Sequence, residues 1–156
     1  MKKIKLMLPM IALFGGCAAP YQPPSSGDTS NVSFVPMLPG TVFVFIHQGD
    51  DVKTCTNGKQ VARLKNGEKT SALLPAGEKI VLHMRQMQMV GLGAMTCDAA
   101  AEFVPESGRN YVFTLGRNGQ CIYSVRDDKG PIRMTKREVT PSAISNDTSW
   151  CKPVAD

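Results

Sequence analysis

Turn sequences centred on glycine recur along most of this chain and leave only short stretches between them. Three are Asn-Gly pairs, at Asn57-Gly58, Asn66-Gly67 and Asn118-Gly119. A tight primed β-turn needs positive φ at both central residues, and Asn and Gly adopt that conformation at low cost. Further turn pairs lie at Ala76-Gly77, Ser107-Gly108 and Lys129-Gly130. Turns spaced about 8 to 12 residues apart favour short hairpin strands in a sandwich or barrel.

The stretches between these turns have the composition of β-strands. We expect strands over residues 60–64, 70–74, 79–89, 95–104, 111–115 and 121–126. Residues 42–46, Val-Phe-Val-Phe-Ile, predict a strand buried on both faces at the centre of the core. Another strand is expected over residues 132–139. The predicted fold is therefore all-β, a single antiparallel β-sandwich with short hairpins.

The first sixteen residues have the architecture of a secretory signal peptide. Lys2, Lys3 and Lys5 precede an apolar run over residues 6–14, which is shorter than the ~20 residues of a membrane-spanning helix. The segment Phe14-Gly15-Gly16-Cys17 resembles the lipobox of bacterial lipoproteins, with phenylalanine in place of the usual leucine. The resemblance implies cleavage before Cys17 and attachment of acyl chains such as palmitate to it. The alternative is a secreted protein that is cut nearby and loses Cys17.

The residue after Cys17 and the charge that remains bear on location and partners. Ala18 stands where an aspartate retains many lipoproteins in the inner membrane, so the resemblance implies an outer-membrane lipoprotein whose domain faces the periplasm. Removing residues 1–16 takes away three of the 18 basic residues and leaves 15 against 13 acidic ones, a net charge of +2. Basic clusters with interleaved aromatic residues are absent from the remainder, so we predict no nucleic-acid partner.

The segment after the cysteine is polar and rich in proline, serine and glycine. Between residues 18 and 33 only Tyr21 and Val32 are larger apolar residues. Such a segment buries too little surface to offset the entropy of ordering it. We therefore expect a flexible tether over residues 17–35, carrying a β-sandwich domain over residues 36–156.

Three turn segments in the middle of the chain resemble those of a known domain type. They are Val-Ala-Arg-Leu-Lys-Asn-Gly at 61–67, Leu-Leu-Pro-Ala-Gly-Glu at 73–78 and Phe-Val-Pro-Glu-Ser-Gly-Arg-Asn-Tyr at 103–111. With them, residues 41–127 are similar to the PEGA-like β-sandwich domains of bacterial lipoproteins. The resemblance implies a non-catalytic envelope module and supplies no functional residues.

Four cysteines remain once Cys17 is set aside: Cys55, Cys97, Cys121 and Cys151. An even number in an exported chain predicts two disulfides. Three pairings are open, and we favour Cys55 with Cys97 and Cys121 with Cys151 because the second bond would fasten the C-terminal tail. A zinc site would require closely spaced Cys-x-x-Cys pairs, which the sequence lacks.

His83 and the methionines after it are the one candidate metal-binding group. Imidazole and thioether ligands suit copper(I), and alternation on a strand would place His83, Met87 and Met89 on one face, with Met84 on the other. We favour the simpler interpretation that the methionines fill an irregular core while His83 lies at a strand edge. The loop over residues 90–94 is expected either as an exposed apolar tip that contacts a partner or as a buried turn.

Catalytic signatures are absent from the sequence. His47 and His83 are its two histidines, and neither belongs to a recognised catalytic motif. Asp50-Asp51 and Asp127-Asp128 are expected to be solvated turn residues. We therefore predict no catalytic residues, no metal and no cofactor.

The predicted function is a non-enzymatic envelope module, either structural or protein-binding. Its partners are the membrane, through the lipid anchor, and an envelope protein or the cell wall; the oligomeric state stays open. Two alternatives are inhibition of a lysozyme-type hydrolase, suggested by features shared with small periplasmic inhibitors, and copper binding by the histidine and methionine group.

Overall fold

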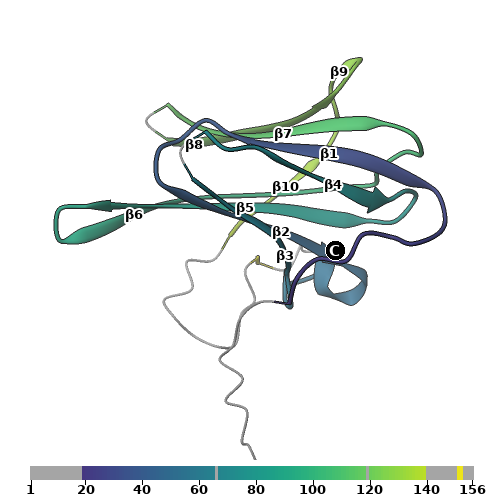
Figure 1. Ribbon diagram of the computed structural model, residues 1–156, viewed down its shortest axis with the longest axis horizontal. Helices are drawn as coiled ribbons and strands as arrows, with labels where there is room; N and C mark the ends of the chain where they lie inside the picture. Colours follow the sequence, from purple (N-terminus) through teal and green to yellow (C-terminus); the bar gives the residue numbers. More distant parts are fainter. Residues whose placement is uncertain (1–18, 66, 119, 140–150, 153–156) are drawn as a thin grey trace, which may run out of the picture.

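A computed structural model describes residues 19–139, except 66 and 119, together with residues 151 and 152. Two five-stranded sheets pack face to face in this part of the chain (Figure 1). Sheet A has the strand order β10-β6-β5-β2-β3, and sheet B has the order β4-β1-β7-β8-β9. The predicted all-β sandwich is confirmed.

The strand bounds follow the turn sequences closely. The elements are β1 (Thr29–Pro36), β2 (Thr41–Gln48), the 3-10 helix η1 (Gly49–Val52), β3 (Lys59–Lys65), β4 (Thr70–Pro75), β5 (Ile80–Val90), β6 (Gly93–Phe103), β7 (Asn110–Asn118), β8 (Gln120–Asp127), β9 (Gly130–Pro131) and β10 (Thr135–Arg137). The six strands expected between the glycine turns correspond to β3 through β8. The strand expected over 132–139 is reduced to the short β10.

The prediction of a flexible tether over residues 17–35 is wrong for its second half. Residues from Thr29 onward form β1, which lies inside sheet B between β4 and β7. Val32 and Phe34 point into the core, and Asn31 and Ser33, which alternate with them, lie on the other face. Hydrogen bonds to two neighbouring strands stabilise this segment, and its polar composition does not reveal those partners. The sandwich therefore begins before residue 36.

Two further details of the predicted sandwich need correction. β1 pairs in parallel with β7, while the other described strand pairs are antiparallel. β2 is not buried on both faces: Val42, Val44 and Ile46 are buried in the core, whereas Phe43 and Phe45 on the outer face of sheet A are only partly covered. The two faces of β2 differ because the layer over the outer face of sheet A is incomplete. An apolar run in the sequence does not show what covers each face.

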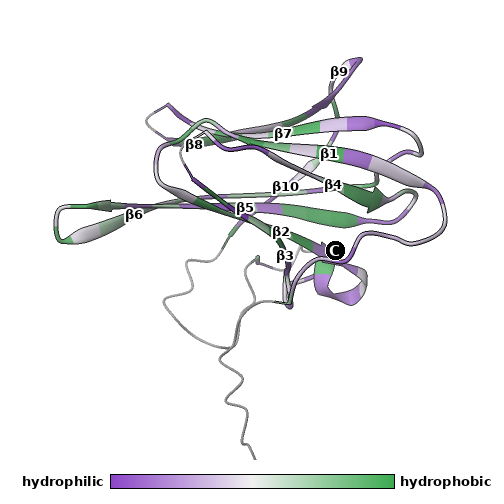
Figure 2. Ribbon diagram, in the orientation of Figure 1, coloured by the Kyte–Doolittle hydropathy of each residue, from purple (hydrophilic) through white to green (hydrophobic). Residues whose placement is uncertain are grey.

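The main core fills the space between the two sheets. Figure 2 shows hydrophobic residues along β2 and β5 within the body of the sandwich. Phe34 of β1 meets Phe113 of β7 edge to face, with ring centroids 6.1 Å apart, and Tyr123 of β8 meets Phe113 in the same way. Edge-to-face contacts suit the quadrupoles of the two rings. Tyr111, Phe113 and Leu115 alternate along β7, and all three face this core.

A second, smaller apolar cluster lies on the outer face of sheet A, beneath η1 and the C-terminal segment. Its buried members are Val52, Cys55, Val81, Ala100 and Cys151. The buried Arg137 of β10 holds this layer together. Its guanidinium donates to the carbonyl oxygens of Val52, Lys53 and Lys152 and, at 2.6 Å, to the carboxylate of Glu102. Part of sheet A is thus buried on both sides.

Candidate functional site

The two disulfides join other partners than those expected. Cys55 pairs with Cys151, with Cα atoms 5.3 Å apart, and Cys97 pairs with Cys121, at 5.6 Å. The favoured pairing is therefore wrong, although all four cysteines are bonded. Cys55 follows η1 on the outer face of sheet A, where the C-terminal segment also lies. Cys97 of β6 meets Cys121 of β8, so the second disulfide joins sheet A to sheet B.

Cys17 lies outside the described residues, but the chain is held against the sandwich from Ala19 onward. The Tyr21 amide donates to the carbonyl of Gln60 at 2.8 Å, and the Gln60 amide donates to the carbonyl of Ala19 at 2.9 Å. The Tyr21 hydroxyl donates to the carbonyl of Leu73 at 2.6 Å, and burial raises its pKa to about 12. The first described residues are therefore docked along β3 instead of forming part of a long free tether.

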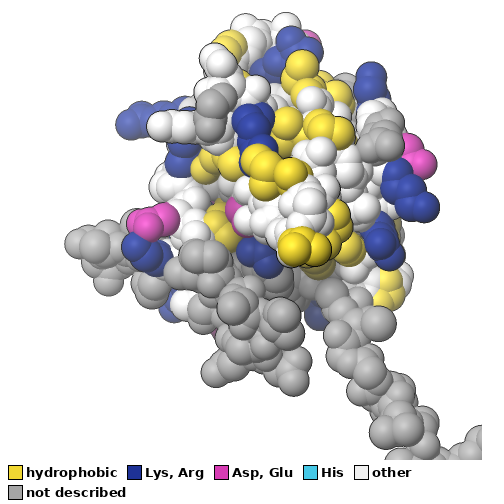
Figure 3. Space-filling view, turned by 90° about the vertical axis from the view of Figure 1, so that its left-hand side faces the viewer, with side chains coloured by type: hydrophobic (Ala, Val, Ile, Leu, Met, Phe, Trp, Pro, Cys, Tyr) yellow, Lys and Arg dark blue, Asp and Glu magenta, His cyan; other side chains and the backbone are white. Residues whose placement is uncertain are grey.

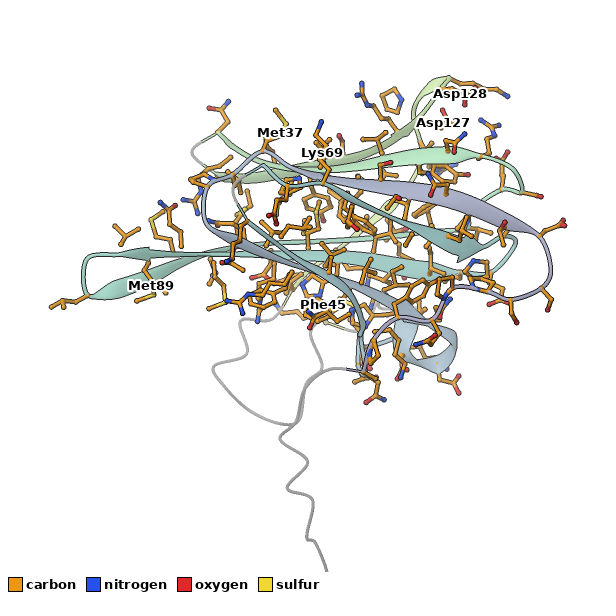
Figure 4. The ribbon with its side chains drawn as sticks, viewed as in Figure 1. Met37, Phe45, Lys69, Met89, Asp127 and Asp128 are labelled. Atoms are coloured by element: carbon orange, nitrogen blue, oxygen red, sulfur yellow. A yellow bond between two sulfur atoms is a disulfide. The ribbon has the colours of Figure 1, made fainter. Side chains whose placement is uncertain are left out.

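The histidine and methionine group expected to suit copper is not assembled. His83 is fully buried in β5, in the middle of sheet A and away from any strand edge, whereas Met89 on the same strand is 74% exposed. Figure 4 shows Met89 on the projecting part of the β5–β6 hairpin. The interpretation of the methionines as core residues holds for Met84 alone, because Met87, Met89 and Met95 are exposed. Among the residues that the structure describes, no group of three His, Cys, Asp or Glu side chains could hold a metal ion.

His83 instead belongs to a buried polar cluster on the outer face of sheet A. Its Nε2 lies 3.4 Å from Oδ1 of Asp98, and Nε of Arg85 donates to the same oxygen at 2.6 Å. The ring of His47 stacks on that of His83, with centroids 5.8 Å apart, and the ring of Phe45 lies 5.7 Å from it. Sequence patterns did not reveal this cluster, because its members come from three strands.

Burial sets the charge states in this cluster. Desolvation lowers the pKa of His47 to about 4, despite its hydrogen bond to the carbonyl of Thr56, and desolvation also lowers the pKa of His83. Desolvation alone would raise the pKa of Asp98, but hydrogen bonds from His83 and Arg85 and the charge of Arg85 outweigh it and lower that pKa. Both histidines are therefore neutral at neutral pH, beside an ionised carboxylate.

The histidine cluster is a packed part of the structure and not an open site. A Cβ atom on Gly58 would come within 2.6 Å of the His47 ring, so glycine is needed where this backbone covers the ring. Two shallow hollows on the described surface are lined by residues 36–39 with Gly67, and by residues 19–22 with Gln48 and Lys59. Neither hollow contains a histidine, so a small molecule in either one would not meet an acid–base group of this cluster.

The loop over residues 90–94 forms an exposed apolar tip, the first of the two expected alternatives. It joins β5 to β6, and the hairpin extends well beyond the body of the sandwich (Figure 1). Leu92 at its end is fully exposed, and Val90 at the end of β5 is about half exposed. Large contiguous apolar surfaces on a soluble domain commonly mark contact sites.

The aspartate pairs expected to be solvated turn residues are divided in their roles. Asp51 accepts hydrogen bonds from the Thr56 hydroxyl at 2.8 Å and the Asn57 amide at 2.9 Å, and so organises the loop after η1. Asp127 is largely buried and pairs with Arg109, while Asp128 is exposed. Asp127 and Asp128 lie at the end of the sandwich opposite the hairpin tip (Figure 4). The expectation fails for Asp127, whose side chain is largely buried, whereas Asp51 is a partly exposed turn residue that also has fixed partners.

Helices long and apolar enough to cross a bilayer do not occur in the part of the chain that the structure describes. No protein-family model matches the sequence, and no curated protein sequence matches it either.

Proposed function

We propose that this protein is a lipid-anchored lipoprotein of the outer membrane, with its β-sandwich facing the periplasm as a non-enzymatic structural or protein-binding module. The observation that carries the proposal is the position of the lipobox-like segment relative to the docked chain. Cys17 stands only two residues before Ala19, whose carbonyl is already hydrogen-bonded to Gln60 of β3. A lipidated Cys17 would therefore hold the sandwich close to the bilayer.

The disulfides support an exported protein. Four cysteines bonded in two pairs are typical of oxidising compartments and rare in the reducing cytoplasm. The bonds fasten the C-terminal segment to sheet A and sheet A to sheet B, as expected for a small domain outside the cytoplasm. The two-sheet fold is also compatible with the PEGA-like resemblance, which stays a prediction.

The buried histidines favour a non-enzymatic role. His47 and His83 are the only two in the sequence, both are fully covered, and both have lowered pKa values. A general base must reach the proton that it removes, and neither ring reaches a described hollow. Copper binding by His83, Met87 and Met89 is not favoured, because the imidazole is buried while both thioethers are exposed. Hydrolase inhibition stays a prediction that a panel of lysozymes can test directly.

The test of the proposal is Cys17→Ser in the full chain, expressed in a Gram-negative host with a clickable palmitate analogue. We expect label on the wild type and none on the variant, and release of the variant from the outer-membrane fraction without loss of the two disulfides. Ala18→Ser, next to the cysteine, is the matched control and should keep both label and location. A wild-type chain that carries no label would overturn the anchor, whatever the behaviour of the sandwich.

A further inference from the structure

The β5–β6 hairpin ends in an uncharged, apolar projection. From residue 86 to residue 97 the sequence contains no charged side chain. Its exposed large apolar residues are Met87, Met89, Val90, Leu92 and Met95. Figure 2 shows the hydrophobic character of this tip, which stands apart from the body of the sandwich.

The backbone of the projection is paired within the hairpin. β5 and β6 stay in register up to Val90 opposite Gly93, so the two strands satisfy each other's inward-facing hydrogen-bonding groups. The pairing of β2 with β5 extends only as far as Thr41, which lies opposite Met87. Apolar side chains on a self-paired hairpin suit an environment with little water, where unpaired backbone groups are costly.

Two basic side chains lie near the base of the projection, Arg117 and Lys65. Arg117 of β7 lies directly against it, with Nη1 3.9 Å from Sδ of Met95 and Nη2 3.4 Å from the carbonyl of Thr96. Lys65 pairs with Thr41, which in turn pairs with Met87, and Lys69 is exposed in the turn that follows β3. Glu68 is the acidic residue of that turn, and its carboxylate accepts the Lys65 amide.

A second apolar segment flanks the hairpin at the same end. The Gln86 amide donates to the carbonyl of Pro39 at 2.8 Å, which holds the turn between β1 and β2 against the hairpin. Met37 in this turn is exposed. Figure 3 looks onto this end and shows hydrophobic side chains gathered in the middle, with more Lys and Arg than Asp and Glu around them.

We propose that the β5–β6 tip inserts into the interfacial region of an anionic lipid bilayer, with Arg117 and Lys65 on the headgroups. An apolar projection within a basic rim matches an acyl–headgroup boundary that carries negative charge. The projection presents mainly thioethers, branched alkyl groups and glycines, with Gln88 and Thr96 as its polar side chains nearer the base. The tip is convex, as insertion requires.

The proposal goes beyond the lipid anchor and does not depend on it. The anchor-proximal chain docks at Gln60, which pairs with Phe45, and Phe45 pairs with His83. His83 therefore marks the level of the docked chain on β5. At about 3.3 Å per residue, Val90 at the tip lies roughly 23 Å further along this strand. Together the two contacts would fix how the sandwich lies on the membrane, which a single flexible anchor cannot do.

The test places a tryptophan at the tip of the full chain. Leu92→Trp is made with Trp150→Phe, so that the new tryptophan is the only one. Its emission is compared in vesicles of phosphatidylethanolamine with phosphatidylglycerol and in vesicles of phosphatidylcholine alone. We expect a blue shift in the anionic vesicles and quenching by brominated acyl chains. Val104→Trp in the same background, an exposed position just after the end of β6 that is opposite the tip, is the matched control and should show neither.

Removing the rim tests the role of charge. Lys65→Gln and Arg117→Gln should each weaken insertion into anionic vesicles by about fivefold, and high salt should have a similar effect. An emission spectrum unchanged by lipid would overturn the proposal. A blue shift without bromolipid quenching would also overturn it, because that result would place the tip against protein. A blue shift that grows with protein concentration in the absence of lipid would overturn it as well and would assign the tip to a contact with a second copy. The tryptophan emission reports on the tip alone, whereas the palmitate label reports on Cys17. Failure of the lipid anchor and failure of tip insertion are therefore distinguishable.

Discussion

The two ends of the β5–β6 hairpin contain similar residues in opposite environments. At its base, Leu82 and Met84 of β5 face the core and are completely buried, while Val81 and His83 are buried on the outer face. At its tip, Met89 and Leu92 are exposed. The strand pairing is continuous between the two ends. Burial therefore depends on what covers each face of the hairpin and does not follow from the residue types along it.

The cover over the outer face should be the costliest part to remove. Cys55→Ala with Cys151→Ala opens a bond that spans 96 residues and should lower the free energy of unfolding by about 4 to 5 kcal/mol. The matched pair, Cys97→Ala with Cys121→Ala, opens a bond spanning 24 residues and should cost about 3 kcal/mol. Urea denaturation of both variants gives the comparison. A larger loss from the second pair would mean that the outer cover contributes little.

Two leucines of the same hairpin test the difference in burial directly. Leu82 is 0% exposed, and Leu82→Ala should destabilise the fold by about 3 kcal/mol, through lost burial and the cavity left behind. Leu92 is fully exposed, and Leu92→Ala should change stability by less than about 0.5 kcal/mol. Thermal and urea unfolding measure both. A substantial loss for Leu92→Ala would show that the tip packs against something in the free protein.

The outer face at the hairpin base should be sensitive to acid. The pKa of His47 falls from its ordinary 6.5 to about 4 on folding, so between those values the unfolded chain binds a proton that the folded chain does not. Stability should therefore decrease as the pH falls through this window, by up to about 3 kcal/mol from His47. The lowered pKa of His83 acts in the same direction.

His47→Gln isolates the contribution of that residue. Urea unfolding at pH 7 and pH 4.5 should show a smaller difference for the variant than for the wild type, whatever its absolute stability. The lowered pKa of Asp98 adds a loss only as the pH falls below its ordinary 3.8, which both measurements avoid. An unchanged pH dependence in His47→Gln would show that this ring is not buried in its neutral form.

The smallest effects are expected from two glycine substitutions, one in the hairpin tip and one in the turn that packs against β5. Gly91 in the tip has φ of +58°, and a Cβ there would meet no other atom within 4 Å, so Gly91→Ala should cost about 1 kcal/mol from backbone strain alone. Gly40 has φ of +98°, and a Cβ there would lie 2.5 Å from the carbonyl oxygen of Met87. Gly40→Ala should therefore cost about 2 kcal/mol. Equal losses in thermal unfolding would contradict this contact.

Much of both sheets was predictable because most strands are marked by local patterns. The turns at Ala76-Gly77 and Ser107-Gly108 bound strands that the structure confirms. β1 was missed because only Val32 and Phe34 mark its inner face, amid serine, asparagine and threonine. Its stability comes from β4 and β7, and both of those strands are distant in the sequence.

The candidate sites were less predictable because they depend on contacts between strands. The sequence offered His83, Met87 and Met89 as neighbours on one face, and alternation does place them so, but it does not reveal that a covering layer ends between them. The His47–His83 stack and the contact of Arg117 with Met95 join residues that lie far apart along the chain. Neither contact leaves a local pattern.

By itself the sequence determined the six strands between the glycine turns, the even number of cysteines and the uncharged stretch over residues 86–97, because each depends on local backbone preference or composition. The tertiary structure decided which cysteines pair, which face of β2 and β5 is covered and how far the hairpin projects. Those features depend on which distant segments meet on each face of a sheet, and strand alternation distinguishes the two faces without saying what lies against either one.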